Sequence, residues 1–293
     1  MHLTITELRS IFGHALTLVL LGVFQALYFR INTTSIALIS CVILLAGFPH
    51  GAADTLIFRR LCPEAGWGRW GLFVTTYLSL AGLVASIWVL SPSFFLAYLL
   101  LISAVHFGED LGQYASPSLG LIYGFSVVLT PSLMWEARVL ELFNCLVGYQ
   151  AAVEWVRLNH YGSWAALTAF TLMLGHYCIR HRNWILIKRT IWPLAALIFL
   201  EPMLGFTFYF CFWHSRIHLL RLSRLDVLDR SLLSFTLISI PMAITIVAIS
   251  IWVKQLEQLS VTYLVKIVFV SLGSLTLPHM LLVASLRRHI SKS

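Results

Sequence analysis

The chain has 293 residues, of which 59% are hydrophobic and only 11% are charged, and its mean hydropathy is +0.86. Soluble domains carry about 25% charged residues, so this composition excludes an ordinary soluble globular protein. The net charge of +8 comes from basic residues in short clusters between apolar runs, which is the pattern of membrane loops rather than of a nucleic-acid-binding surface. We therefore predict an all-α, polytopic membrane protein that binds no nucleic acid.

Apolar segments long enough to enter or cross a bilayer follow one another along the whole chain. The first has no convincing cleavage site for a signal peptide, so we predict that it is a helix of the bundle. A stretch at 135–150 is amphipathic instead, and we expect it to lie along the membrane interface. Together the segments predict a single transmembrane domain, 1–293, with about 8–10 membrane-spanning helices. The apolar segments are 11–30, 35–58, 71–91, 93–113, 119–134, 161–180, 184–201, 203–222, 231–253 and 260–286.

The number of crossings depends on 184–222, which is either one bent helix or a hairpin. Glu201-Pro202 interrupts this stretch, because proline removes a backbone donor and disfavours helix before it. A hairpin gives ten crossings and places the basic clusters of the later loops on the same side as the earlier ones. We therefore predict the hairpin, in a multi-pass protein of the inner (cytoplasmic) membrane.

Four short segments place ionisable groups deep in otherwise apolar sequence. Ionisable groups at such depth are costly and usually face the interior of a bundle, so each segment is a candidate for function. In three of them the polar side chains are four residues apart, a spacing that brings them to one face of a helix. The pattern is typical of a metal ligand beside a carboxylate that orients it, together with one helix that supplies two ligands. The pairs are His50 and Asp54, His106 and Asp110, and His214 and His218.

The histidines of these segments also share a predicted depth. His50, His214 and His279 each precede an arginine by seven to nine residues. At 1.5 Å per residue, this places their imidazoles roughly 10–14 Å below the charged surface. Independent core histidines would have no reason to share a layer, so we predict that His50, His106, His214 and His218 form one metal site. His279 is a candidate fifth ligand, a substrate contact or a structural group.

The residue types narrow the choice of metal only in part. Ligation by imidazoles without cysteine suits zinc, copper, iron or nickel. A dication in a low dielectric needs nearby negative charge, for which Asp54, Glu109 and Asp110 are available, although the two aspartates could instead cap helix ends. The scattered cysteines form no Cys-x-x-Cys motif and indicate neither a disulfide framework nor a cysteine metal site. Four further histidines are interpreted as packing or surface groups: His14, His160, His176 and His181.

In chain order the four segments contain the motifs PHGAAD, HFGED, WHSRIH and PH. This series resembles the Brp/Blh (bacteriorhodopsin-related protein) family of bacterial and archaeal β-carotene 15,15'-dioxygenases, over about residues 40–285. The resemblance implies a non-haem Fe(II) dioxygenase that uses O₂ to cleave β-carotene, or a related carotenoid, at its central double bond and so gives retinal. It implies iron ligation by His50, His106, His214 and His218. A retinal-binding rhodopsin is the functional partner that such a product suggests.

Two other classes of protein remain as alternatives at this point. Diiron membrane hydroxylases and desaturases carry several HxxxH and HxxHH boxes, whereas this sequence has one HxxxH and no HxxHH, which favours a mononuclear site. A proton or metal-ion transporter could use buried His and Asp as a relay. The shared depth of the histidines argues against the transporter, because an ion pathway would distribute polar groups across the membrane.

Overall fold

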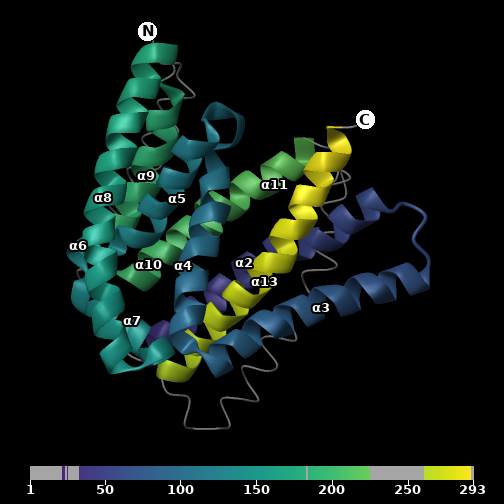
Figure 1. Ribbon diagram of the computed structural model, residues 1–293, viewed down its shortest axis with the longest axis horizontal. Coiled ribbons are helices and arrows are strands. Elements are labelled where there is room, and N and C mark those ends of the chain that lie inside the picture. The colour runs from purple at the N-terminus through teal and green to yellow at the C-terminus, as the bar shows by residue number, and fades with distance from the viewer. Residues whose placement is uncertain (1–21, 24, 26–32, 183, 225–260, 292–293) are drawn as a thin grey trace.

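The structure is a computed structural model, and it describes residues 22–23, 25, 33–182, 184–224 and 261–291. The predicted segment 231–253 and nearly all of 11–30 lie outside these residues. Figure 1 shows the described part as a bundle of helices, with α8 along one side, α3 projecting on the other and α13 between them. The elements are α2 (Thr33–Leu61), α3 (Trp67–Leu90), α4 (Pro92–Gly108), η1 (Glu109–Tyr114), α5 (Pro117–Leu129), α6 (Pro131–Met134), α7 (Glu136–Val147), α8 (Tyr149–His181), α9 (Ile185–Phe199), α10 (Pro202–Thr207), η2 (Phe208–His214), α11 (Ser215–Arg224) and α13 (Val261–Ile290).

Four helical stretches among the described residues are long and apolar enough to cross a membrane. Large apolar side chains such as Leu72, Leu83 and Leu101 are exposed on their outer faces. So much exposed apolar surface is unfavourable in water and suits contact with lipid. The prediction of an all-α membrane protein is thus confirmed, whereas the predicted number of crossings stays a prediction. The four stretches are Trp67–Leu90, Pro92–Gly112, Pro117–Met134 and Thr262–Ile290.

Helix α8 differs most from its predicted bounds, because it begins at Tyr149 rather than at 161. The added turns are amphipathic. Ala152 and Val156 are buried against the amphipathic helix α7, while Glu154 and Arg157 form an exposed ion pair. A search for apolar segments misses such turns, because their mean hydropathy is low even though one face of the helix is buried.

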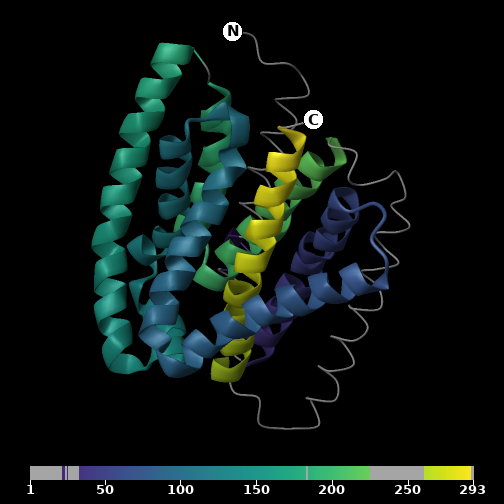
Figure 2. The same cartoon turned by 45° about the vertical axis from the view of Figure 1, so that its right-hand side comes forward.

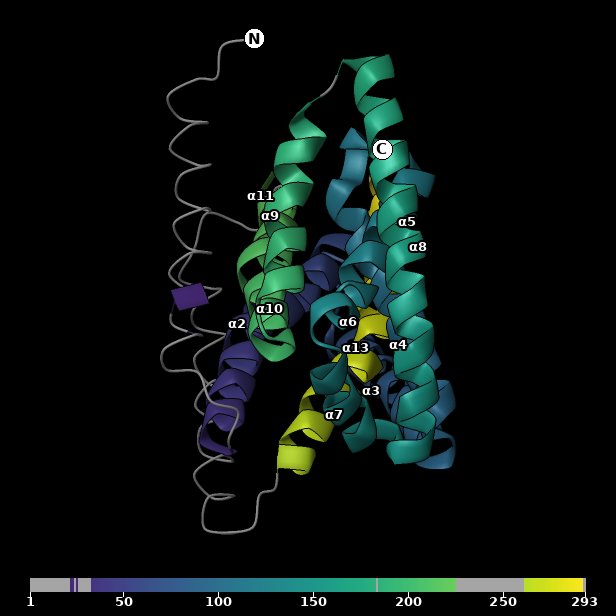
Figure 3. The ribbon, with the colours of Figure 1, turned by 90° about the vertical axis from the view of Figure 1, so that its left-hand side faces the viewer.

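The stretch 184–222 forms the predicted hairpin. Helix α9 ends before Leu200, whose backbone is extended, and the Glu201 carboxylate then caps α10 by accepting the backbone N–H groups of Met203 and Leu204 at 3.0 and 3.2 Å. Pro202 occupies the first turn of α10, where it leaves no helical hydrogen bond unmade. Helix α9 contacts both α10 and η2, and Figure 3 shows α10 at the lower end of α9.

Small residues let α4 and α5 pack in close antiparallel contact. A Cβ atom added to Gly108 would lie 2.6 Å from the carbonyl oxygen of Gly120, and Gly124 faces Ala104 in the same way. Only glycine permits such an approach of two backbones. The two contacts also define the register of the pair, in which each step toward the start of α4 corresponds to a step toward the end of α5.

The C-terminal halves of α2, α11 and α13 are packed together. Figure 2 shows α2 in purple and α13 in yellow. A buried cluster that includes Ile57, Leu222 and Leu286 joins the three helices just beyond their histidines. Because Ile57 and Leu286 each follow a histidine by seven residues, the histidines lie in one layer. This arrangement agrees with the common depth expected from the sequence.

Candidate metal centre

Five buried histidines from five different elements converge in the middle of the bundle. They form two overlapping groups of three, and within each group the candidate ligand nitrogens all lie within 4.8 Å of one another. His50 belongs to both groups, so it occupies the centre of the cluster. The two groups are His50, His106 and His214, and His50, His218 and His279.

The imidazole nitrogens in this cluster are poorly satisfied by protein groups. The Nε2 atoms of His106 and His214 are 3.0 Å apart. Nitrogens of His50, His106, His218 and His279 are buried without a hydrogen-bond partner among the described residues. Buried polar atoms without partners are costly and uncommon. A divalent cation shared by neutral imidazoles would satisfy several of these lone pairs at once, so the residues present fit a metal ion.

The Asp110 carboxylate orients one of these imidazoles. Its Oδ1 atom is 2.8 Å from His214 Nδ1, and its Oδ2 atom accepts the hydroxyl of Tyr209 at 2.6 Å. With Nδ1 bonded to the carboxylate, the Nε2 atom of His214 is left to face the cluster. Carboxylates that hold the outer nitrogen of a histidine in this way fix its tautomer and raise its basicity as a ligand.

A π-helical turn makes this arrangement possible. The segment η2, Phe208–His214, is a π-helix, in which residues five apart lie above one another. Tyr209 and His214 therefore share a face and both reach Asp110, and their rings are nearly parallel, with an interplanar angle of 22°. In a regular α-helix, these two side chains would point in quite different directions. Such π-helical turns are frequent at functional sites.

The Asp54 carboxylate repeats the arrangement on the other side of the cluster. Its Oδ1 atom is 2.7 Å from His279 Nδ1, and its Oδ2 atom accepts the hydroxyl of Tyr77 at 2.6 Å. The sequence suggested that each aspartate orients the histidine of its own motif. The structure instead pairs both aspartates with histidines of other helices, because residues four apart on one helix point side by side toward the neighbouring helix rather than at each other.

Glu109 does not take part in the cluster. Its carboxylate forms an ion pair with Arg287, and its backbone carbonyl accepts a hydrogen bond from Arg221. These contacts join the basic ends of α11 and α13 to the end of α4, at the rim of the bundle. The expectation that Glu109 compensates the charge of a metal ion is therefore not supported, whereas Asp54 and Asp110 lie one hydrogen bond from the candidate ligands.

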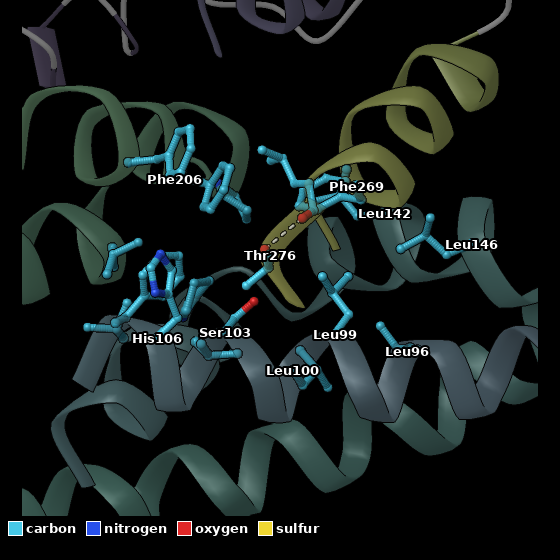
Figure 4. Close-up of a pocket in the computed structure, with 18 of the residues that line it drawn as sticks. Leu96, Leu99, Leu100, Ser103, His106, Leu142, Leu146, Phe206, Phe269 and Thr276 are labelled. Carbon is cyan, nitrogen blue, oxygen red and sulfur yellow. Dashed lines mark hydrogen bonds between the residues drawn. The ribbon is translucent and has the colours of Figure 1, made fainter. Parts of the chain in front are cut away.

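An apolar cavity of about 220 Å³ adjoins the cluster. His50, His106 and His279 line it, and its walls are otherwise mostly leucine and phenylalanine side chains from α4, α7, α9, α10, η2 and α13. In Figure 4, His106 lies at one end of the lining residues and Leu146 at the other. The cavity therefore offers an apolar ligand direct access to the histidines.

Three kinds of residue in this site carry little signal in the amino-acid sequence. Tyr77 lies in an apolar segment without any motif, and Tyr209 belongs to an aromatic run that is most simply interpreted as helix packing. The structure gives that run further roles, since Phe206 and Phe210 line the cavity. The cavity-lining leucines are equally indistinguishable in sequence from those that face lipid.

A buried polyhistidine cluster with two orienting carboxylates, open to an apolar cavity, defines a helical membrane protein with a candidate metal centre. The chain matches the family model described as beta-carotene 15,15'-dioxygenase over residues 41–287, and it belongs to that family. It is 28% identical over 262 residues to the beta-carotene 15,15'-dioxygenase of the uncultured marine bacterium 66A03, with 83% of this chain and 90% of the relative covered. No solved structure matches the chain. The family resemblance inferred from the motifs is thus confirmed.

Proposed function

We propose that this protein is an iron-dependent dioxygenase that cleaves β-carotene, or a closely related carotenoid, at the central 15,15' double bond. The observation that carries the proposal is the apolar cavity that ends on the buried histidine cluster, in a chain of this family. The reaction balances without a further oxidant. The carbon–carbon double bond breaks, each of its two carbons receives one oxygen atom of O₂, and two retinal aldehydes form.

The residues of the cluster divide between holding the metal and orienting its ligands. We assign His50, His106, His214 and His218 as the ligands, and His279 as a fifth nitrogen donor because its Nε2 atom is buried without a partner beside His50 and His218. Bound Fe(II) would supply the binding and activation of O₂. Asp54 and Asp110 hold two of the imidazoles by Nδ1 and bring two negative charges near the dication, which lowers the cost of its burial.

The cavity and the outer surface of the bundle suit a substrate that is dissolved in lipid. A polyene that enters between helices reaches the cavity without crossing water, and apolar walls hold it by burial alone. Apolar walls also disfavour bulk water, which would protect a reactive centre from side reactions. We place the protein in the inner (cytoplasmic) membrane, where the retinal that it releases would be available to a retinal-binding rhodopsin.

The activity is tested most simply in cells that accumulate β-carotene. Expression of the wild-type chain is expected to remove the orange colour and to give retinal, identified by chromatography. His50→Ala and His214→Ala are expected to abolish both effects while the protein remains in the membrane. His176→Ala, which removes an exposed histidine of α8, is the matched control and should behave like wild type. Normal turnover by both cluster variants would remove the assignment.

Metal stoichiometry separates the proposal from its alternatives. Purified protein is expected to bind one iron per chain. Two irons per chain would support a diiron hydroxylase or desaturase instead. Ion flux in proteoliposomes, without loss of colour from added carotenoid, would support a transporter.

A further inference from the structure

One buried polar side chain at the cavity has no role in the proposed reaction. Asn159 of α8 is only 4% exposed and lines the cavity. Its backbone carbonyl accepts the hydroxyl of Ser163, but within the described residues its side-chain amide has no hydrogen-bond partner. Buried amides are nearly always hydrogen-bonded, because an unpaired one keeps its full desolvation cost. The cavity is the space from which a partner for this amide could come.

Asn159 lies at the end of the cavity that is far from the histidines. The register of α4 and α5 pairs Gly108 with Gly120 and so sets His106 level with Ile122, which Ser132 follows by ten residues, about 15 Å, along the helical stretch Pro117–Met134. Leu96 precedes His106 by ten residues of α4, a distance of about 15 Å along the helix axis. Ser132 in turn neighbours the first half of α8, since its carbonyl oxygen is 3.2 Å from Nδ1 of His160, the residue after Asn159.

This far end of the cavity combines an apolar wall with two polar groups. Leu96, Val139 and Leu146 are all buried and line it. Ser132 also lines it, and its Oγ atom has no hydrogen-bond partner among the described residues. A hydrocarbon ring would fill the apolar part but leave the amide of Asn159 unpaired. A ring that carries a hydroxyl group would satisfy it, because an amide can both donate a hydrogen bond to an oxygen and accept one from a hydroxyl.

We propose that Asn159, with Ser132, forms a subsite for the hydroxylated ring of a carotenoid. The preferred substrate then has at least one oxygenated ring, which lies against Asn159 while the central double bond lies at the histidines. As a statement about catalysis this rests on the proposed function. As a statement about binding it can be tested without any turnover.

The test compares two carotenoids that differ by a single ring hydroxyl, β-cryptoxanthin and β-carotene. Their affinities for the purified, full-length protein in detergent are measured from the visible absorption change under argon, so that no cleavage occurs. Wild type is expected to bind β-cryptoxanthin about two- to tenfold more tightly, the range for one net hydrogen bond. In Asn159→Leu the ratio of the two affinities should fall to about one.

Two further variants keep the test decisive. Ser132→Ala is a smaller change, which should lower the ratio even if Asn159→Leu does not fold. Ser274→Ala is the matched control, because Ser274 is also buried with an unpartnered hydroxyl but does not line the cavity, and it should keep the wild-type ratio. Equal affinities in wild type, or a ratio unchanged in the Asn159 and Ser132 variants, would overturn the subsite.

The outcomes also separate the subsite from the proposed activity. If the affinity ratio behaves as expected but aerobic incubation gives no retinal from either carotenoid, the subsite stands and the proposed function fails. If β-carotene is cleaved to retinal but wild type binds the two carotenoids equally tightly, the proposed function stands and the subsite fails. When both are correct, β-cryptoxanthin gives one retinal and one hydroxylated retinal, and the variants change its cleavage more than that of β-carotene.

Discussion

Two hydrogen-bonded triads flank the histidine cluster, and they are chemically identical but differ in their surroundings. The Asp110 triad comprises Tyr209, Asp110 and His214, and the Asp54 triad comprises Tyr77, Asp54 and His279. In both, an aspartate accepts one tyrosine hydroxyl and holds one histidine by Nδ1. The Asp110 triad is buried throughout, whereas Tyr77 of the Asp54 triad is only partly buried and borders the cavity.

This difference indicates that the two triads have different roles, one in stability and one at the substrate side of the site. Tyr209 is fully buried within the main hydrophobic core, so the Asp110 triad ties the centre to the fold. The Asp54 triad borders the space for the substrate, because Tyr77 and His279 both line the cavity. Perturbing the first should therefore affect metal binding and stability together, and perturbing the second should affect mainly the site.

The largest expected contrast comes from removing the histidine of each triad. His214→Ala leaves the Asp110 carboxylate buried without its partner and removes a ligand whose Nε2 atom lies 3.0 Å from that of His106. We expect it to lose bound iron and all retinal formation. His279→Ala keeps the four other imidazoles and should retain part of both. Iron analysis of the purified variants, with retinal measured on the same samples, gives the comparison. A greater loss of iron and retinal formation in His279→Ala than in His214→Ala would show that the Asp54 triad, not the Asp110 triad, matters more for the metal centre.

Neutralising the aspartates is expected to have the next largest effect. Asp110→Asn and Asp54→Asn each keep the side-chain shape but remove the charge that fixes the histidine tautomer. Changes to such partners of metal ligands typically cost about 10- to 100-fold in metal affinity or activity. Iron titration of the metal-free proteins measures the effect, with Glu109→Gln as the control because Glu109 pairs with Arg287 at the rim. Unchanged affinity in both aspartate variants would show that these carboxylates do not act on the centre.

The smallest expected difference concerns the tyrosine hydroxyls. Tyr209→Phe leaves a carboxylate oxygen of Asp110 buried without a partner, which should destabilise the protein by about 1–3 kcal/mol. Tyr77→Phe should cost less, because Tyr77 is only partly buried and borders the cavity. Thermal unfolding in detergent compares the two. If Tyr77→Phe proved the more destabilising change, the claim that the Asp110 triad contributes more to stability than the Asp54 triad would be wrong.

The sequence was informative where function depends on a local pattern. A histidine in an apolar run is visible without any knowledge of the fold, and its distance from the next arginine gives its depth. His50, His214 and His279 could be placed in one layer in this way. Hydropathy likewise predicted most helices, and the Glu201-Pro202 break predicted the turn of the hairpin.

The remaining features depend on contacts between distant parts of the chain. Asp54 and His279 are 225 positions apart, and nothing in either motif specifies that they pair. The π-helical turn before His214 changes which residues share a face, so a pattern based on 3.6 residues per turn misplaces Tyr209. Asn159 lies in the polar start of α8, which reads in the sequence as a solvated stretch.

The central claim is that imidazoles from separate helices hold a single metal ion, and His50 tests it most directly because it belongs to both groups of candidate ligands. Metal-free wild type and His50→Ala should be dialysed against Fe(II) under argon and their bound iron measured per chain. We expect one iron per chain in wild type and none in His50→Ala, with both proteins folded in detergent. Equal iron content in the two proteins, or no iron in either, would contradict the account.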